Sequence, residues 1–270
     1  MLKETTIGIF GDSFACRAWG NNTGKSWPEI LKEKHGYYKQ TNFAEAGSSL
    51  FFSYHNFLKS HTHQPFDKVI FVITSPGRLS LPPSILINSQ WASRHVVPVS
   101  LRADFEGLDF LIDNTNNEQE KSLFIGHKRA LHAAEEYFTY IYDDAQDTHN
   151  NIGLVNNLMT MRPDGLFIPT VRNETAEEFG LPDPANDRNK FPSVFSEVCK
   201  KEITITGKDF FEVASTGRDS RHCHMSEENN EIFADKIAHF LETGEFSLNA
   251  DDFVYDKNLD VTTVFTRMQQ

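Results

Sequence analysis

Cysteine is scarce in this sequence, and the cysteines present form no recognisable framework. Cys16, Cys199 and Cys223 are odd in number and widely spaced, so they do not describe a disulfide-stabilised domain, and we expect reduced thiols. Long apolar stretches are also lacking. The longest, residues 69–73, is far below the roughly 20 residues that cross a bilayer, and the N-terminus has no apolar segment of the secretory type. These absences predict a soluble cytoplasmic protein, with a virion-associated protein as the alternative.

Positive charge is in short supply as well. The sequence has 26 Lys and Arg residues against 38 Asp and Glu residues, which gives a formal net charge of −12 at pH 7. Such a field repels the phosphate backbone of nucleic acids and the surface of anionic membranes. We therefore expect neither nucleic acid nor membrane as a partner. The 270 residues, 39% of them hydrophobic and 12% aromatic, are sufficient for a globular protein with a sizeable core.

The hydrophobic pattern predicts strands and helices in alternation. Short runs that are apolar on both faces are typical of strands in the middle of a parallel sheet that helices cover. The expected strands are residues 5–10, 37–43, 68–73 and 166–169. The expected helices are residues 26–34, residues 53–59, one long or two consecutive helices over 128–159, and residues 227–241 with Ser226 as cap and Gly244 at the end. This order predicts an α/β protein with a central parallel sheet.

Two segments do not fit this alternation. Residues 79–127, approximately, contain paired prolines, scattered arginines and an asparagine-rich stretch, and they are too long for a plain connection. We interpret them as an insertion with structure of its own. Residues 245–270 are acidic at first and alternate weakly afterwards, which indicates an arm that packs on a neighbouring copy. The predicted organisation is one domain over residues 1–244, including the insertion, followed by this C-terminal arm.

A serine follows the first predicted strand in the motif Gly11-Asp12-Ser13. The carboxyl ends of parallel strands form the edge at which open α/β folds bind ligands, and the serine N–H can help to hold an oxyanion. The alternative is that the Asp-Ser pair only closes a turn. After the second strand, Gly47 can bring another backbone N–H close to the same edge, although a glycine in a loop is common.

A third motif, residues 219–227 (Asp-Ser-Arg-His-Cys-His-Met-Ser-Glu), comes directly before the last predicted helix. An acid and a histidine on one loop suit a general base whose ring is oriented by a carboxylate. His222 and His224 are both candidates for this base. The two histidines and Cys223 are also of the ligand types that zinc prefers. Alternate residues of an extended segment point to opposite sides, however, so we expect no metal.

In their order and approximate spacing, the three motifs resemble the blocks of the SGNH, or GDSL-like, serine hydrolases. The resemblance covers about residues 5–80 and 160–242. It implies a three-layer α/β/α, flavodoxin-like fold and an esterase without metal or organic cofactor. By position, it implies Ser13 as the nucleophile, the amides of Ser13 and Gly47 as oxyanion donors, and Asp219 as the acid. His222 has the family spacing from Asp219, whereas His224 has the family place before the final helix and is slightly favoured.

The sequence departs from the family at the block after the buried strand. The family has Gly-x-Asn-Asp there, and this chain has Thr74, Ser75, Pro76, Gly77 and Arg78. A hydroxyl of Thr74 or Ser75, or the Arg78 guanidinium, could replace the missing amide as an oxyanion donor, whose loss costs on the order of 10²–10³ in rate. Arg78 could instead hold a substrate carboxylate or phosphate, or form a surface ion pair.

The sequence as a whole predicts a serine-dependent hydrolase of acyl or acetyl esters, including esters of carbohydrates. Its expected partners are a small-molecule or carbohydrate ester and, through the arm, a second copy of the chain. The alternative is a catalytically inactive chain of the same fold that binds glycans or serves as a virion structural module. A measurement of glycan binding without hydrolysis distinguishes the two.

Overall fold

The structure of the chain is a computed structural model that describes residues 3–16, 25–63, 65–74, 77–80, 95–96, 101–169, 225, 227–246 and 252–253. Its centre is a four-stranded sheet in the order β2-β1-β3-β6, in which every pair of neighbours is parallel. The strands are β1 (Ile7–Phe10), β2 (Gln40–Asn42), β3 (Lys68–Ile73) and β6 (Leu166–Pro169). The order is that of the first four strands in the flavodoxin-like arrangement 2-1-3-4-5.

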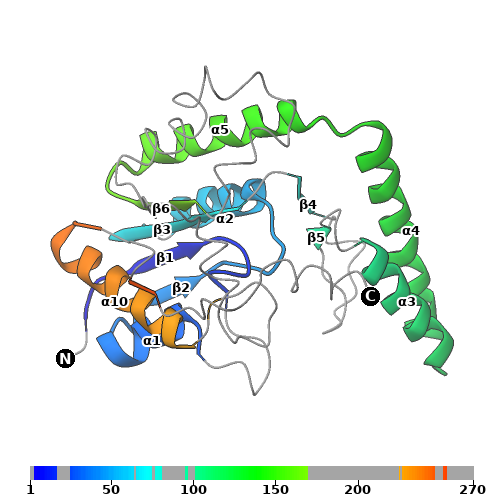
Figure 1. Cartoon of the computed structure of the whole chain (residues 1–270), viewed down its shortest axis with the longest axis horizontal. Coiled ribbons are helices and arrows are strands. Elements are labelled where there is room, and N and C mark those ends of the chain that lie inside the picture. Colours follow the sequence, from blue (N-terminus) through cyan, green and yellow to red (C-terminus); the bar gives the residue numbers. More distant parts are fainter. Residues whose placement is uncertain are drawn as a thin grey trace.

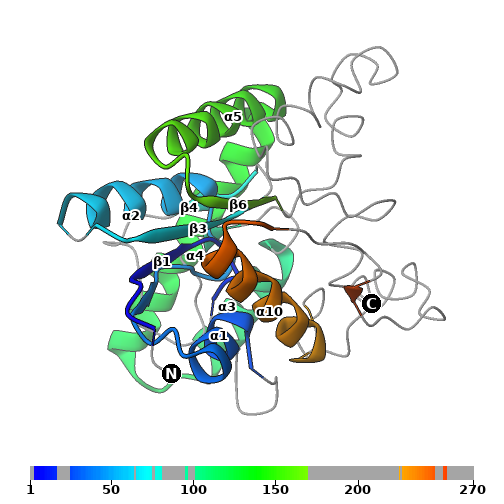
Figure 2. The same cartoon turned by 90° about the vertical axis from the view of Figure 1, so that its left-hand side faces the viewer.

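Helices cover both faces of the sheet (Figures 1 and 2). On one face lie α1 (Trp27–His35) and α10 (Glu227–Thr243), and on the other lie α2 (Leu50–His63) and α5 (Asp144–Met161). The predicted three-layer α/β/α architecture with a central parallel sheet is therefore confirmed. Each of these helices follows or precedes a strand, as crossover connections between parallel strands require.

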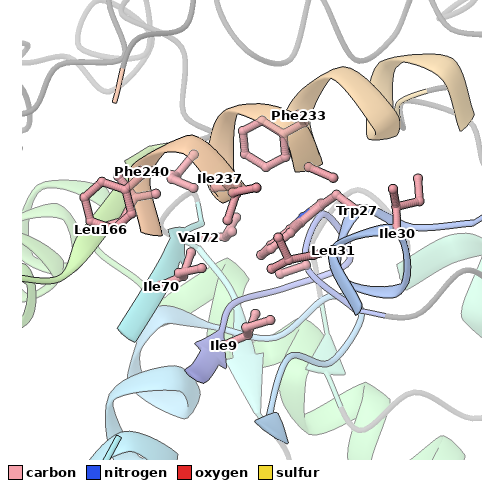
Figure 3. Packing of buried hydrophobic residues seen from close by; sticks show 14 of the residues in the cluster. Ile9, Trp27, Ile30, Leu31, Ile70, Val72, Leu166, Phe233, Ile237 and Phe240 are labelled. Carbon is pink, nitrogen blue, oxygen red and sulfur yellow. The ribbon is translucent and has the colours of Figure 1, made fainter. Parts of the chain in front are cut away.

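The core beneath α1 and α10 is aliphatic on the sheet side, and on the helix side it combines aromatic with aliphatic side chains. Successive strand residues point to opposite faces, so every second residue of each strand enters this cluster. Its strand members are Ile7, Ile9, Ile70, Val72, Leu166 and Ile168. Figure 3 shows Trp27 of α1 and Phe233 of α10 above them, and the two rings meet edge to face with centroids 5.5 Å apart. This packing fixes α10 against α1 at one side of the sheet.

The core beneath α2 and α5 is built from stacked phenylalanines of neighbouring strands. Phe71 of β3 stacks on Phe10 of β1 with centroids 5.0 Å apart and on Phe167 of β6 at 5.2 Å. Phe57 of α2 meets the Phe10 ring edge to face at 5.6 Å. These phenylalanines stabilise the core, because each aromatic pair contributes about 0.5–1.5 kcal/mol beyond the effect of its buried area.

The predicted helix over residues 128–159 differs from the structure at two turns, one that contains an asparagine and one that contains an aspartate. α4 (Glu118–Tyr140) begins ten residues before the predicted position 128, because the Asn117 side chain caps it by accepting hydrogen bonds from the Gln119 and Glu120 N–H groups. The pattern over 128–159 then divides into two helices. The break lies at residues 141–143, where the Asp143 side chain accepts from the Gln146 N–H at 2.7 Å and starts α5.

The predicted insertion contains α3 (Leu101–Asn114), the first part of α4, and the antiparallel pair β4 (Leu79–Ser80) and β5 (His95–Val96). α3 and α4 lie side by side at one end of the molecule (Figure 1) and share a small core of Leu108, Phe124, Ala130, Leu131 and Ala134. The bounds of the insertion stay a prediction. In the C-terminal segment, Phe246 and Phe253 pack against the core of their own domain. Among the helices described, none has the length and apolar character of a membrane-spanning segment.

Candidate active site

Ser13 lies just after β1, at the carboxyl edge of the parallel sheet, and is half-buried. The chain turns sharply around it. The N–H groups of Ala15 and Cys16 both donate to the Asp12 carbonyl at 3.0 Å, and the Phe14 N–H donates to Asp12 Oδ1 at 3.0 Å. The aspartate therefore closes the turn, as the alternative interpretation of the motif expects, and at the same time it fixes the position of the serine that follows.

Asp12 is the centre of a buried polar network beneath this turn. The residue is 0% exposed, and its Oδ2 accepts hydrogen bonds from Thr74 Oγ1 at 2.9 Å and from Arg78 Nη1 at 2.9 Å. The Arg78 side chain is 15% exposed, and its Nη1 also lies 3.4 Å from the Ser48 carbonyl oxygen. Arg78 thus forms an ion pair with a buried carboxylate, and not the surface ion pair that was one of the alternatives predicted for it. Its predicted roles toward a substrate stay predictions.

Thr74 and Arg78, which follow β3, therefore already have a hydrogen-bond partner within the protein. Thr74 is 2% exposed, and its hydroxyl donates to the Asp12 carboxylate, so this proton is not available to a substrate oxyanion. The other hydroxyl considered as an oxyanion donor, that of Ser75, lies outside the described residues. The loss of the family amide is therefore expected to lower the rate of any esterase reaction here.

The loop that carries Gly47 contacts the loop that carries Ser13. The Glu45 N–H donates to the Gly11 carbonyl at 3.2 Å, and the Ser48 hydroxyl donates to the same oxygen at 2.8 Å. Gly47 has a φ of 73°, a left-handed conformation that favours glycine. Two hydrogen bonds to the Gly11 carbonyl thus join the segments from which the sequence predicts the oxyanion donors.

Gly11 allows β1 to pass close to β3 immediately before the Ser13 turn. A Cβ at this position would lie 2.7 Å from Val72 Cβ, well inside van der Waals contact, and the neighbouring atom belongs to a short, stiff side chain. The close approach of these strands therefore depends on the missing side chain.

We expect Gly11→Ala to lower the free energy of unfolding by about 1–3 kcal/mol, because the added methyl group overpacks the contact with Val72. The matched control is Gly126→Ala in α4, where a Cβ has no neighbour within 4 Å. That change is expected to be neutral or to stabilise by up to about 1 kcal/mol. Urea denaturation of both variants measures the difference, and equal free energies would contradict the described contact.

Hydrogen bonds connect the Ser13 turn to the segment before α10. Trp27 Nε1 donates to the Phe14 carbonyl at 2.8 Å, and the Trp27 N–H donates to Asn230 Oδ1 at 2.9 Å. Asn230 Nδ2 in turn donates to the Met225 carbonyl at 3.0 Å. Phe14 and Met225 also belong to the same buried cluster. The residue after Ser13 and the residue after His224 are therefore held in one part of the core.

The remaining predicted catalytic residues, Asp219, His222 and His224, lie outside the described residues. Within the described part of the chain, no group of three or more His, Cys, Asp or Glu side chains is placed to hold a metal ion. Cys16 is buried and its Sγ donates to the Ser13 carbonyl at 3.5 Å. The burial and this contact make Cys16 a structural part of the Ser13 turn.

A cavity of about 520 Å³ opens at the same edge of the sheet, between the N-terminal ends of α2 and α5. Arg78 lines it and connects it to the Ser13 turn through Asp12. Asp147 of α5 also lines it, and its Oδ2 accepts from the Gly77 N–H at 2.7 Å, which holds the loop after β3 in place. Asp147 could not be recognised from the sequence, because an acidic residue early in a helix is ordinary.

The chain matches no protein-family model and no curated protein. Among solved structures, it aligns with a crystal structure from Parabacteroides merdae at 2.86 Å, described as that of "a putative GDSL-like lipase". The alignment covers 74% of this chain and 98% of the other, with 10% sequence identity and a TM-score of 0.16. Values this low do not establish a shared fold.

Proposed function

We propose that the protein is a serine-dependent ester hydrolase with Ser13 as its nucleophile. The observation that carries the proposal is the position of Ser13. It is half-buried at the carboxyl edge of a parallel sheet, in a turn fixed by the buried Asp12, and its loop contacts the loop of Gly47. Sites of open α/β folds are formed at this edge.

In the proposed reaction, Ser13 Oγ forms a bond to the ester carbonyl carbon while a histidine accepts the hydroxyl proton. The N–H groups of Ser13 and Gly47 stabilise the oxyanion. The bond to the alcohol then breaks, and the histidine returns the proton to the leaving oxygen. Water attacks the acyl-serine in the same way and releases the acid. Since the histidine must be neutral to act as base, the rate is expected to rise with pH through the imidazole range, near about 6.5.

The base is proposed to come from the segment before α10, as His222 or His224, with Asp219 orienting it. The hydrogen bonds from Phe14 through Trp27 and Asn230 to Met225 support this choice, since they hold the chain next to His224 in the same core cluster as the chain next to Ser13.

Covalent labelling tests the nucleophile. A fluorophosphonate probe is expected to label the wild-type protein and not Ser13→Ala, because the probe reacts with an activated serine. The matched control is Ser122→Ala, which changes an exposed serine of α4 and is expected to label like the wild type. Intact-protein mass spectrometry and hydrolysis of p-nitrophenyl acetate are the measurements. Equal labelling of wild type and Ser13→Ala would end the proposal.

The second candidate function is glycan binding by a chain that has lost catalysis. The hydrogen bonds that the Thr74 hydroxyl and Arg78 Nη1 donate to Asp12 favour it, because these donors are then not available to replace the missing oxyanion donor. Wild-type protein that binds glycans but neither reacts with the probe nor hydrolyses the ester would support this candidate.

A further inference from the structure

We infer that the cavity between α2 and α5 binds a neutral saccharide, and that this saccharide is the alcohol part of the ester. The inference rests on the proposed function for its catalytic half, since it names the substrate class of that site. The volume of about 520 Å³ lies within the range of about 300–1,000 Å³ that small-molecule sites occupy. The cavity is also next to the reaction centre, because Arg78 in its wall contacts the residue before Ser13.

The charges in the cavity wall argue against an anionic ligand. Among the lining residues that the structure describes, Arg78 carries the guanidinium charge, and this charge is already matched by the buried carboxylate of Asp12 at 2.9 Å. Asp147 adds a second carboxylate to the wall. The local balance is therefore neutral to negative, and a ligand carboxylate or phosphate would meet repulsion from Asp147 without a cation of its own. A ligand without charge fits this wall.

The polar groups of α5 argue against a bare acyl chain. His149, Asn150 and Asn151 all line the cavity, and the side chains of His149 and Asn150 are exposed. Asn151 Nδ2 donates to the Asp147 carbonyl oxygen at 2.9 Å and to Asp147 Oδ2 at 3.2 Å, so these two residues are bonded to each other. The Asn150 amide offers both a donor and an acceptor. A hydrocarbon chain bound against these polar groups would displace the water molecules that hydrogen-bond to them and would offer no hydrogen bonds in return. Hydroxyl groups of a sugar donate and accept at once, so they can satisfy amides, imidazole and carboxylate together.

An exposed aromatic ring completes the match to a sugar. Phe51, in the first turn of α2, is 60% exposed although it lines the cavity, and the His55 ring lies 6.3 Å from it one turn later. Pyranose rings carry hydroxyl groups around the rim and C–H groups on their faces. A sugar can therefore place one C–H face on the Phe51 ring while its rim reaches Asn150 and Asp147. Leu50 and Leu154 form the remaining apolar wall.

The experiment uses the Ser13→Ala protein, which binds without turning over, and measures saturation-transfer NMR and titration with neutral tetrasaccharides of glucose, xylose and N-acetylglucosamine. At least one is expected to bind, and Phe51→Ala in the same background is expected to weaken that binding about tenfold. Phe51→Trp is expected to retain it. The matched control is Phe110→Ala, which removes an equally exposed phenylalanine (67%) from α3 and should leave binding unchanged.

The outcomes test saccharide binding in the cavity separately from catalysis by Ser13. Binding that Phe51→Ala weakens supports the inference even where Ser13 proves unreactive, and then favours the glycan-binding function. No binding by any of the saccharides would overturn the inference, as would equal binding by Phe51→Ala and Phe110→Ala. If no saccharide binds and Phe51→Ala in the otherwise wild-type protein selectively loses hydrolysis of p-nitrophenyl octanoate, the inference is overturned and the cavity is an acyl pocket.

Discussion

Arg78→Ala is expected to lower the free energy of unfolding by about 3–5 kcal/mol, which is a large part of the stability of an ordinary domain. The reason is the carboxylate that the variant leaves behind. Asp12 is 0% exposed, and Arg78 Nη1 at 2.9 Å is its counter-ion. Without the guanidinium, the buried charge keeps, among the described residues, the hydrogen bonds from Thr74 and the Phe14 N–H. Urea denaturation followed by circular dichroism measures the loss.

The matched control is Lys34→Ala, which removes a cation from a surface pair. Lys34 is 42% exposed and lies 2.7 Å from Glu231 and 2.9 Å from Asp235, so its removal is expected to cost no more than about 1 kcal/mol. A double variant, Asp12→Asn with Arg78→Ala, tests the cause. It is expected to be less destabilised than the sum of the single variants, because it removes both charges together. Additive effects, or an Arg78→Ala loss as small as that of Lys34→Ala, would refute the buried pair.

The layers of the fold could be predicted because each strand has a distinct local pattern. The run over β3 is apolar at nearly every position, and the structure places alternate residues of this strand, Ile70 and Phe71 for example, in the two cores. The start of α4 was missed although its signal is present. Asn117 with Glu120 three residues later is a capping pattern, but it lies in an asparagine-rich stretch that also suits a loop.

The contacts of the candidate site were less predictable than its location. That Ser13 ends a buried strand is a local property of the sequence, and so is the turn made by Asp12. The partners of that aspartate are not local. Arg78 is separated from it by 66 positions and Asp147 holds Gly77 across 70 positions, and no periodicity relates such pairs. An arginine after a strand and an acid in a helix are common on surfaces, so only the fold distinguishes these two from the ordinary case.

The largest effect on rate is expected from one of two histidine variants. Replacing the catalytic histidine with alanine should lower kcat/KM for p-nitrophenyl acetate by about 10³-fold, within the roughly 10²–10⁴ range of general acid–base catalysis. Replacing the other should change it little. We expect the large loss in His224→Ala. Its chain neighbour Met225 is 2% exposed and is bound through its carbonyl by Asn230, whereas His222 is two residues further from that anchor.

A rate alone does not separate a lost base from a disturbed loop, so the pH profile of each variant is part of the test. The variant that lacks the base should lose the rise in kcat/KM near about pH 6.5, and the other should retain it. The fluorophosphonate reaction should slow in parallel, because the same histidine activates Ser13. A large loss in His222→Ala, with the pH-dependent rise retained in His224→Ala, would assign the base to His222. The Asp-x-x-His spacing between Asp219 and His222 would then determine which histidine reaches Ser13. The hydrogen bond from Asn230 to the Met225 carbonyl would only hold the start of α10 in place. Full activity in both variants would remove the imidazole from the mechanism and with it the reason for Ser13 to react.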